Sequence, residues 1–335
     1  MALNGQCAEL EDFTAVTGVF QYTTNTSWGY RSGYQRGTPY QFGAGASSEI
    51  YKALPAAKTT QCIGVRCGDG TRWSTATTRL LSIASGTVPL IAVFTTATTG
   101  ELKLCRWNLS TWDVLDTGAV PSASPFRLDM YVENYGATGR VRVWLTYTLG
   151  YAPAVLWLDS GVVDITTSGY ANFDGIYLVP RAPAAGDGSF SELVFADEPT
   201  HRMNLVTIYP DAAGDVNQWV GAYTDVDELE ASTADFTESG TAGQLFLCNV
   251  TDLPVGTGYT PLGVQVTALA AKGTSGPTKI KLAIKTHGTV YYSGDFTLDV
   301  AYKGYSYLWT TNPSTGIGWT TAEITALQIG YESVT

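Results

Sequence analysis

The residues that could carry acid–base or nucleophilic chemistry are few in this chain of 335 residues. The two histidines, His201 and His287, have no serine or cysteine beside them in a nucleophile-like setting. The sequence contains no G-x-S-x-G motif, phosphate-binding loop or dinucleotide fingerprint, and its histidines and cysteines lack the spacing of a zinc site. We therefore expect a protein that is not an enzyme.

An acidic run, DVDELE, is the main cluster of carboxylates. Asp225, Asp227 and Glu228 in this run are the candidate ligands of a calcium ion, because calcium prefers oxygen ligands. The run lacks the glycine and the terminal bidentate glutamate of an EF-hand loop, and the simpler interpretation is a solvated acidic loop. The same carboxylates are the candidate pair of a glycosidase, which we keep as the less favoured alternative. No other cofactor is indicated.

A second candidate site is aromatic. The stretch QYTTNTSWGYRSGYQRGTPYQFG places Trp28, Tyr30 and Tyr34 among glycine and small polar residues. Together with Trp144, which falls on a later strand, these are the candidate carbohydrate-binding residues, since aromatic rings can stack on sugars. The alternative is that the rings cover the core of a sandwich.

The cysteine pattern does not indicate a disulfide framework. The number is odd, and the five are Cys7, Cys62, Cys67, Cys105 and Cys248. Cys62 and Cys67 fall on one predicted strand and, from their spacing, should face opposite sides of it. Cys7 precedes any clear predicted element, so it is the candidate for an intermolecular disulfide in an assembly.

The composition favours a folded, β-rich, acidic protein. Charged residues make up 15% of the chain, and glycine (36) and tyrosine (20) are frequent, which favours strands and tight turns. The net charge of −11 argues against nucleic acid and against an anionic membrane surface as partners. The N-terminal residues show no secretory signal and no apolar run is long enough to span a bilayer, so we expect a protein folded in a cytoplasm without membrane insertion.

The alternation of apolar and polar residues predicts antiparallel sheets. In 127–133, Leu128, Met130 and Val132 share one face, and 141–149 shows the same period of two. Such strands recur roughly every ten to fifteen residues without a helical pattern between them, as in a β-sandwich. Asp197-Glu198-Pro199 ends one of these strands, because proline cannot donate to a ladder.

We accordingly predict two antiparallel β-sandwich (jelly-roll) domains, 1–199 and 200–335. The seam includes Pro210-Asp211 and Gly214-Asp215, which we interpret as a turn. Predicted strands of the second domain are 244–250, 262–270, 279–285, 296–302 and 305–309. Thr320 and Glu323 fit a capping box that opens a short helix near the C-terminal end of the sequence.

Several stretches resemble the two-domain virion proteins of tailed bacteriophages and their gene-transfer-agent-like relatives. FSELVFADEPT followed by RMNLVTIYPDAAGDVNQW, and the ending WTTNPSTGIGWTTAEITALQIGYESV, carry this resemblance. The succession FRLDMYVENYGATGRVRVWLTY, GYANFDGIYLVP and FSELVFAD is similar to the strand order of a concanavalin or laminin-G lectin domain.

The resemblance implies a non-enzymatic virion structural protein with a lectin-like first domain. It would be a tail fibre, spike, collar or head-decoration component, assembled in the bacterial cytoplasm and located in the virion. Its partners would be other virion proteins and further copies of itself, with a trimer favoured, together with a host-surface polysaccharide. A purely structural decoration or neck protein without a ligand is the first alternative, and a capsule-degrading glycosidase is the second.

Overall fold

The computed structural model groups the chain into two compact units, which meet in sequence between Leu205 and Val206. The predicted boundary between domains falls a few residues earlier, after residue 199. The structure describes residues 3–7, 15–17, 20–22, 40–42, 49–68, 78–96, 100–119, 126–146, 154–178, 189–201, 203, 205–228, 233–253 and 260–335.

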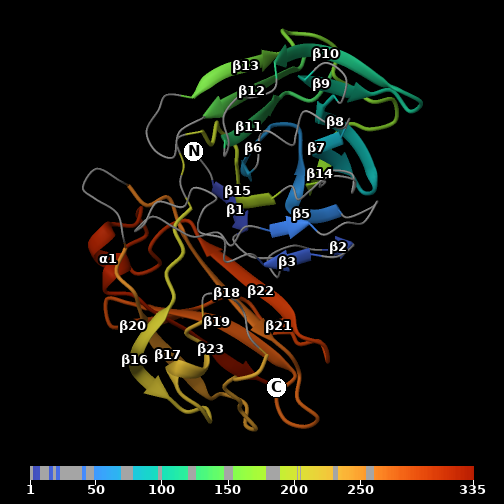
Figure 1. The fold of residues 1–335 in the computed structure, drawn as a ribbon. Helices are drawn as coiled ribbons and strands as arrows, with labels where there is room; N and C mark the ends of the chain where they lie inside the picture. Colours follow the sequence, from blue (N-terminus) through green and yellow to red (C-terminus); the bar gives the residue numbers. More distant parts are fainter. Residues whose placement is uncertain are drawn as a thin grey trace. The chain divides into compact units, whose positions relative to one another are not determined.

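The described part of the first unit consists of two antiparallel sheets, A and B (Figure 1). In spatial order, sheet A contains β13 (Val155–Asp159), β12 (Arg140–Thr146), β11 (Phe126–Glu133), β6 (Gln61–Gly68), β15 (Ser189–Ala196), β4 (Tyr40–Phe42) and β3 (Phe20–Tyr22), and β1 (Leu3–Cys7) also pairs with β15. Sheet B contains β10 (Trp112–Ala119), β9 (Glu101–Trp107), β8 (Val88–Thr95), β7 (Thr78–Ser85), β14 (Phe173–Leu178), β5 (Glu49–Lys58) and β2 (Ala15–Thr17).

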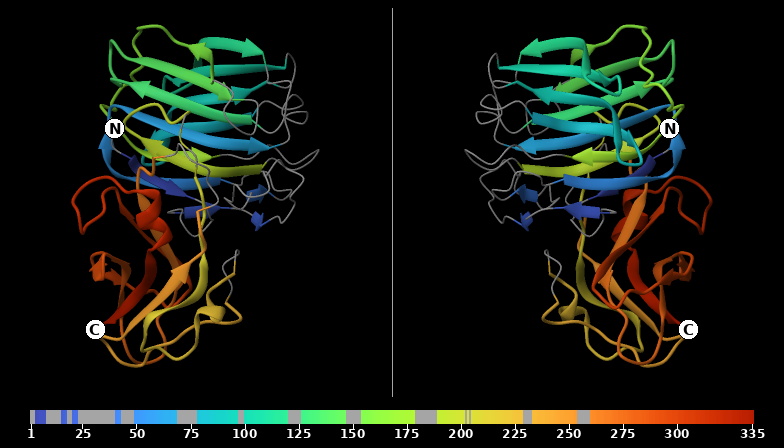
Figure 2. Two further views of the ribbon diagram at one scale, coloured as in Figure 1. Left: turned by 90° about the vertical axis from the view of Figure 1, so that its left-hand side faces the viewer. Right: turned by 90° about the vertical axis from the view of Figure 1, so that its right-hand side faces the viewer.

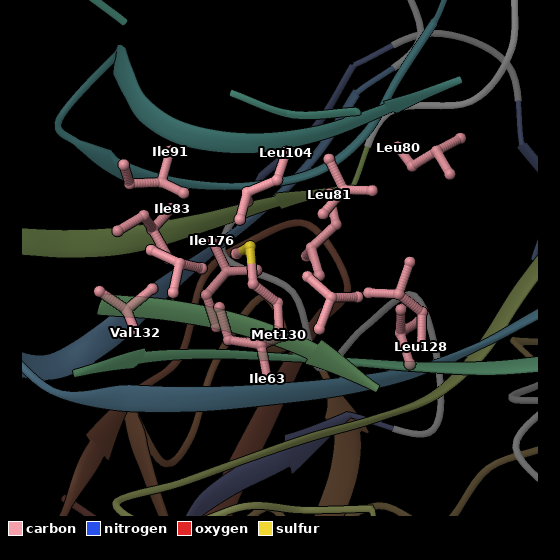
Figure 3. Close-up of a cluster of buried hydrophobic side chains, with 14 of the residues drawn as sticks. Ile63, Leu80, Leu81, Ile83, Ile91, Leu104, Leu128, Met130, Val132 and Ile176 are labelled. Atoms are coloured by element: carbon pink, nitrogen blue, oxygen red, sulfur yellow. The ribbon is translucent and has the colours of Figure 1, made fainter. Parts of the chain in front are cut away.

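One hydrophobic core joins the inner faces of sheets A and B. Figure 3 shows Ile63 and Met130 of sheet A pointing toward Leu81, Leu104 and other side chains of sheet B, and all of these are fully buried. Burial of each such side chain contributes about 1.5–3 kcal/mol relative to exposure, so this core is the main source of stability of the unit. The predicted period-two pattern is confirmed for β11, since Leu128, Met130 and Val132 face the core. It is confirmed for 141–146 on β12 as well, whereas 147–149 lie outside the described residues.

A buried ion pair lies on the other, outer face of sheet A. Arg127 is 6% exposed and Asp129 is fully buried, with the Arg127 Nε 3.1 Å from Asp129 Oδ2. The segment after β15 covers the pair: Thr200 Oγ1 donates to Asp129 Oδ1, and Arg127 Nη2 donates to the Thr200 carbonyl at 3.3 Å. Gly64 lies beneath these groups, and a Cβ atom there would collide with all three of them. The outer face therefore holds a buried polar cluster in place of apolar packing, which we call the Arg127–Asp129 cluster.

The second unit contains a larger sheet, C, and a two-stranded sheet, D. In spatial order, sheet C contains β16 (Pro210–Asn217), β17 (Leu245–Val250), β23 (Gln328–Val334), β19 (Lys279–Thr286) and β20 (Thr289–Tyr292), and β21 (Phe296–Thr297) also pairs with β19. Sheet D contains β18 (Val264–Ala270) and β22 (Lys303–Trp309). Figure 2 gives two further views of these strands, coloured yellow to red. Leu282 and Ile284 of sheet C share a core with Val266 and Trp309 of sheet D.

Among the described residues of the second unit, the short helices are α1 (Thr321–Thr325) and a 3₁₀ turn at Tyr223–Asp225. The predicted capping box is confirmed: the Glu323 N–H donates to Thr320 Oγ1 at 3.2 Å, and the Thr320 N–H donates to Glu323 Oε2 at 2.8 Å. The all-β fold class, with antiparallel sandwiches and a short helix near the C-terminal end, is likewise confirmed for the described residues.

Two sequence-based predictions in the second unit were wrong. Pro210-Asp211 and Gly214-Asp215, interpreted as a turn, lie within strand β16 (Pro210–Asn217) at the edge of sheet C. An edge position tolerates proline, and Gly214 is needed because a Cβ atom there would meet the Leu247 carbonyl. The strand predicted for 296–302 is only Phe296–Thr297, and the exposed Val300 and Tyr302 lie beyond it.

Candidate functional site

The outer face of sheet B carries a cluster of aromatic side chains. On β8 and β9, Val93 and Leu104 are cross-strand partners that face the core. Phe94, the next residue after Val93, therefore points to the outer face, because successive side chains of a strand alternate. Trp107 and Trp112 are half-buried on the same side of β9 and β10, and they line one pocket with Phe94.

The Trp112 ring contacts both of the other rings. The centroids of Phe94 and Trp112 are 4.9 Å apart with an interplanar angle of 69°, and those of Trp107 and Trp112 are 5.2 Å apart at 52°. They form one wall of a pocket of about 390 Å³, which falls within the volume range of small-ligand sites. We call this the aromatic pocket, and its lining residues are Arg79, Thr87, Val88, Pro89, Phe94, Trp107 and Trp112.

A tight hairpin between β9 and β10 sets the distance between the two tryptophans. Trp107 and Trp112 are directly paired across the strands, and only Asn108–Thr111 connects them. The Asn108 Oδ1 accepts hydrogen bonds from the backbone N–H groups of Ser110 (3.1 Å) and Thr111 (2.8 Å), which closes the turn. The ring geometry is therefore a product of local turn chemistry.

An ion pair supports this hairpin. Arg106 Nη2 donates to Asp113 Oδ2 at 2.7 Å, and Asn108 Nδ2 donates to Asp113 Oδ1 at 2.7 Å. The hydrogen bond from Arg106 is the main reason that the pKa of the Asp113 carboxyl lies below its usual value. Arg106 and Asp113 are cross-strand partners that alternate with Trp107 and Trp112, so the charges support the hairpin from the opposite face.

Further ring contacts continue from the pocket across sheet B. The Arg79 guanidinium carbon lies 5.7 Å from the centroid of the Tyr177 ring, and the Tyr177 and Tyr51 rings are 4.8 Å apart. Gly175 makes room for Tyr51, since a Cβ atom at this position would collide with the Tyr51 ring. The pKa of the Tyr51 hydroxyl is raised, mainly by partial burial. The hydroxyl is therefore protonated at neutral pH and can donate a hydrogen bond.

The groups that line the aromatic pocket are suited to binding a small ligand. Three aromatic rings provide flat apolar surfaces, and Arg79 and Thr87 provide polar groups at its border. No carboxylate is among the described residues that line the pocket, so they offer no acid–base pair of the kind that hydrolyses glycosides.

The aromatic residues proposed from the sequence are not those of the pocket. Trp28, Tyr30 and Tyr34 lie outside the described residues. Trp144 is 9% exposed, and its ring lies 5.2 Å from the His201 ring and 5.0 Å from the Arg142 guanidinium. These contacts cover much of the ring, and sugar binding by Trp144 stays a prediction.

The predicted calcium ligands belong to the 3₁₀ turn of the second unit and the residues after it. Asp225 Oδ2 accepts a hydrogen bond from the Ala222 N–H at 2.9 Å. The pKa of the Glu228 carboxyl is raised, first by partial burial and then by the neighbouring Asp235 and Asp227. Within the described ranges, no group of three histidine, cysteine or acidic side chains is arranged to hold a metal ion. Calcium binding by Asp225, Asp227 and Glu228 stays a prediction.

Four of the five cysteines have described side chains, and these four are unreactive buried thiols. The side chain of Cys7 is outside the described part of the chain. Cys62, Cys67, Cys105 and Cys248 are free and buried. Burial raises the pKa of the Cys105 thiol to about 11 and that of Cys62 to about 12. Cys7 was expected to precede any regular element; it is in fact the last residue of β1, paired with Leu193 of β15. Its intermolecular disulfide stays a prediction.

No family model and no curated protein matches the chain. Solved structures that match include a bifunctional GH43-CE protein of Bacteroides eggerthii, with 9% sequence identity and a TM-score of 0.36 over 58% of this chain and 26% of that one. The carbohydrate-binding module CBM66 from Bacillus subtilis matches with 12% identity and a TM-score of 0.33, over 58% of this chain and 96% of the module.

A third match is the CBM2 module of the evolved Dit protein of Lactobacillus casei BL23 phage J-1. It has 14% identity and a TM-score of 0.36, over 58% of this chain and 94% of the module. At TM-scores below 0.5 these likenesses do not assign a function to this chain. None of the described helices is both long and apolar enough to cross a membrane.

Proposed function

We propose that the first unit binds carbohydrate in the aromatic pocket. The observation that carries this proposal is the cluster of Phe94, Trp107 and Trp112 around a pocket of about 390 Å³. The apolar C–H faces of sugar rings pack on aromatic rings, and a few polar groups at the border then orient the ligand. A hairpin closed by Asn108 holds the two tryptophans in place, so binding need not order them.

A glycan array followed by isothermal titration of the bound glycans tests this proposal. Trp112→Ala should weaken binding about thirtyfold, since an aromatic hot spot contributes about 2 kcal/mol. Val114→Ala is the matched control, because Val114 lies on the same strand, is 53% exposed and does not line the pocket. Absence of binding to every glycan, or equal affinity of Trp112→Ala and wild type, would contradict the proposal.

We further propose that the protein is a non-enzymatic structural component of a phage virion. The support is the resemblance carried by FSELVFADEPT, RMNLVTIYPDAAGDVNQW and the C-terminal stretch. A tail fibre, spike, collar or head-decoration position and a homo-oligomer, with a trimer favoured, follow from the same resemblance. Repetition of one weak glycan site in an oligomer would raise its avidity for a host-surface polysaccharide.

Cryo-electron microscopy of whole particles tests the virion role. A chain located at a tail tip or spike with the first unit outermost supports adhesion. A chain whose aromatic pocket is covered by neighbouring proteins favours the purely structural alternative without a ligand. The glycosidase alternative requires release of sugar from capsule, and it requires that Asp227→Asn or Glu228→Gln abolish this release.

A further inference from the structure

We propose that the aromatic pocket selects sugars that carry a carboxylate, and that Arg79 is the residue that determines this selectivity. This inference rests on the proposed carbohydrate binding and specifies its ligand class. Arg79 is the single charged side chain among the described residues that line the pocket. Its guanidinium stays protonated at any physiological pH.

The backbone register places Arg79 next to the aromatic wall. Arg79 of β7 and Phe94 of β8 are direct cross-strand partners, so their Cβ atoms are about 4.5–5.5 Å apart. The Phe94 ring contacts Trp112 at 4.9 Å between centroids. A single sugar ring packed against Phe94 and Trp112 therefore lies within reach of the guanidinium.

The Tyr177 ring supports Arg79 from the side away from Phe94. The guanidinium carbon is 5.7 Å from the Tyr177 centroid, a distance at which a cation and an aromatic face attract each other. Tyr177 is in turn held by Tyr51, at 4.8 Å between centroids. A guanidinium partly positioned in this way loses less freedom when it binds a carboxylate, and its planar fork matches the two carboxylate oxygens.

Neighbouring charged groups of the first unit have other partners. Lys103, the cross-strand partner of Phe94 on β9, lies 3.7 Å from Glu101. Asp174 of β14 accepts a hydrogen bond from the Gly86 N–H at 2.8 Å. Arg79 is the charged side chain that the described lining of the pocket supplies.

The net charge of the whole chain indicates which class of acidic glycan the pocket can bind. With a net charge of −11, the protein repels a densely anionic polymer at long range. One guanidinium can form an ion pair with one carboxylate, so we expect a glycan in which neutral sugars flank an isolated carboxylate. Dense polyanions are therefore expected to bind more weakly than singly carboxylated oligosaccharides.

The test is isothermal titration with singly carboxylated oligosaccharides, sialyllactose and cellobiouronic acid among them, each paired with its methyl ester. The ester keeps the sugar ring and removes the charge. For every pair that binds, the acid should bind about tenfold or more tightly than the ester, because hydrogen bonds to charged groups are the strong ones. Arg79→Gln should abolish this difference between acid and ester.

Arg79→Lys is the second variant, since it keeps the charge without the planar fork and should retain part of the preference. Thermal unfolding of each variant checks that the fold is intact, and the comparison of acid with ester in the wild type needs no variant. Equal affinity for acid and ester, with binding still lost in Trp112→Ala, would overturn this inference and leave the proposed function standing. If neither acids, esters nor neutral glycans bind, both are wrong.

Discussion

Removal of one charge from the Arg127–Asp129 cluster is expected to destabilise the first unit severely. Asp129→Asn keeps the size of the side chain and its hydrogen bond from Thr200, but it leaves Arg127, which is 6% exposed, without a counter-charge. An unpaired buried charge costs about 3–5 kcal/mol. For a domain of this size 1 kcal/mol corresponds to roughly 2–4 °C, so the melting temperature of the first unit should fall by roughly 6–20 °C.

Urea unfolding followed by circular dichroism measures this change. Arg127→Met combined with Asp129→Asn removes both charges and should recover most of the loss, since neutral replacements of a buried pair are well tolerated. Glu133→Gln is the matched control: Glu133 lies on the same strand and pairs with Arg142 at 2.8 Å in a partly exposed position, so about 0–1 kcal/mol is expected. A loss below about 1 kcal/mol in Asp129→Asn, or a double variant as unstable as the single one, would show that the buried pair does not have this role in stability.

Three further predictions concern stability and reactivity. The hydrogen bond from His287 and those from Thr320 lower the pKa of the Glu323 carboxyl to about 2. The ionised carboxylate therefore contributes its full stabilisation above the pKa of the unfolded state, about 4.3, and this contribution is lost as the pH falls toward 2. Glu323→Gln should therefore lower the melting temperature of the second unit at pH 7 and not at pH 2. Gly330→Ala should lower the free energy of unfolding by about 1–3 kcal/mol, because its Cβ atom would meet the Phe246 carbonyl. Gly318→Ala is the control, since the added Cβ atom would meet no neighbour and urea unfolding should change little. The four described free thiols should react with a thiol reagent only after denaturation, and fast labelling of the native protein would contradict their burial.

The predictable parts of the fold are those with one apolar and one solvated face. Strand β19 shows this clearly, since Ile280, Leu282 and Ile284 are buried while Lys279 and Lys281 pair with acidic side chains. The α1 helix was predictable for a different reason, because a capping box depends only on residues within four consecutive positions.

Edge strands were missed because their sequences lack that contrast. The residues of β16 alternate only between half-buried and exposed, and β10 contains no buried residue. Without β10, Trp112 had no assigned place, and the aromatic pocket could not be predicted. The available signal was the pair Trp107 and Trp112 flanking a four-residue turn that begins with Asn108, which is typical of a hairpin with paired ends.

Burial by a distant segment is a second feature that the sequence does not indicate. Trp144 alternates with Val143 and Leu145 on β12, which predicts that it faces away from the core. The segment after β15 returns over that face and brings His201 to 5.2 Å from the Trp144 ring. No local pattern in the sequence indicates such a long-range cover.

A crystal structure of the protein with a glycan found by the array would locate the carbohydrate site. We expect a sugar ring packed on Trp112 and Phe94, with a carboxylate of the glycan at the Arg79 guanidinium. A glycan bound elsewhere on the first unit, with the aromatic pocket empty, would contradict the assignment of this pocket as the carbohydrate site.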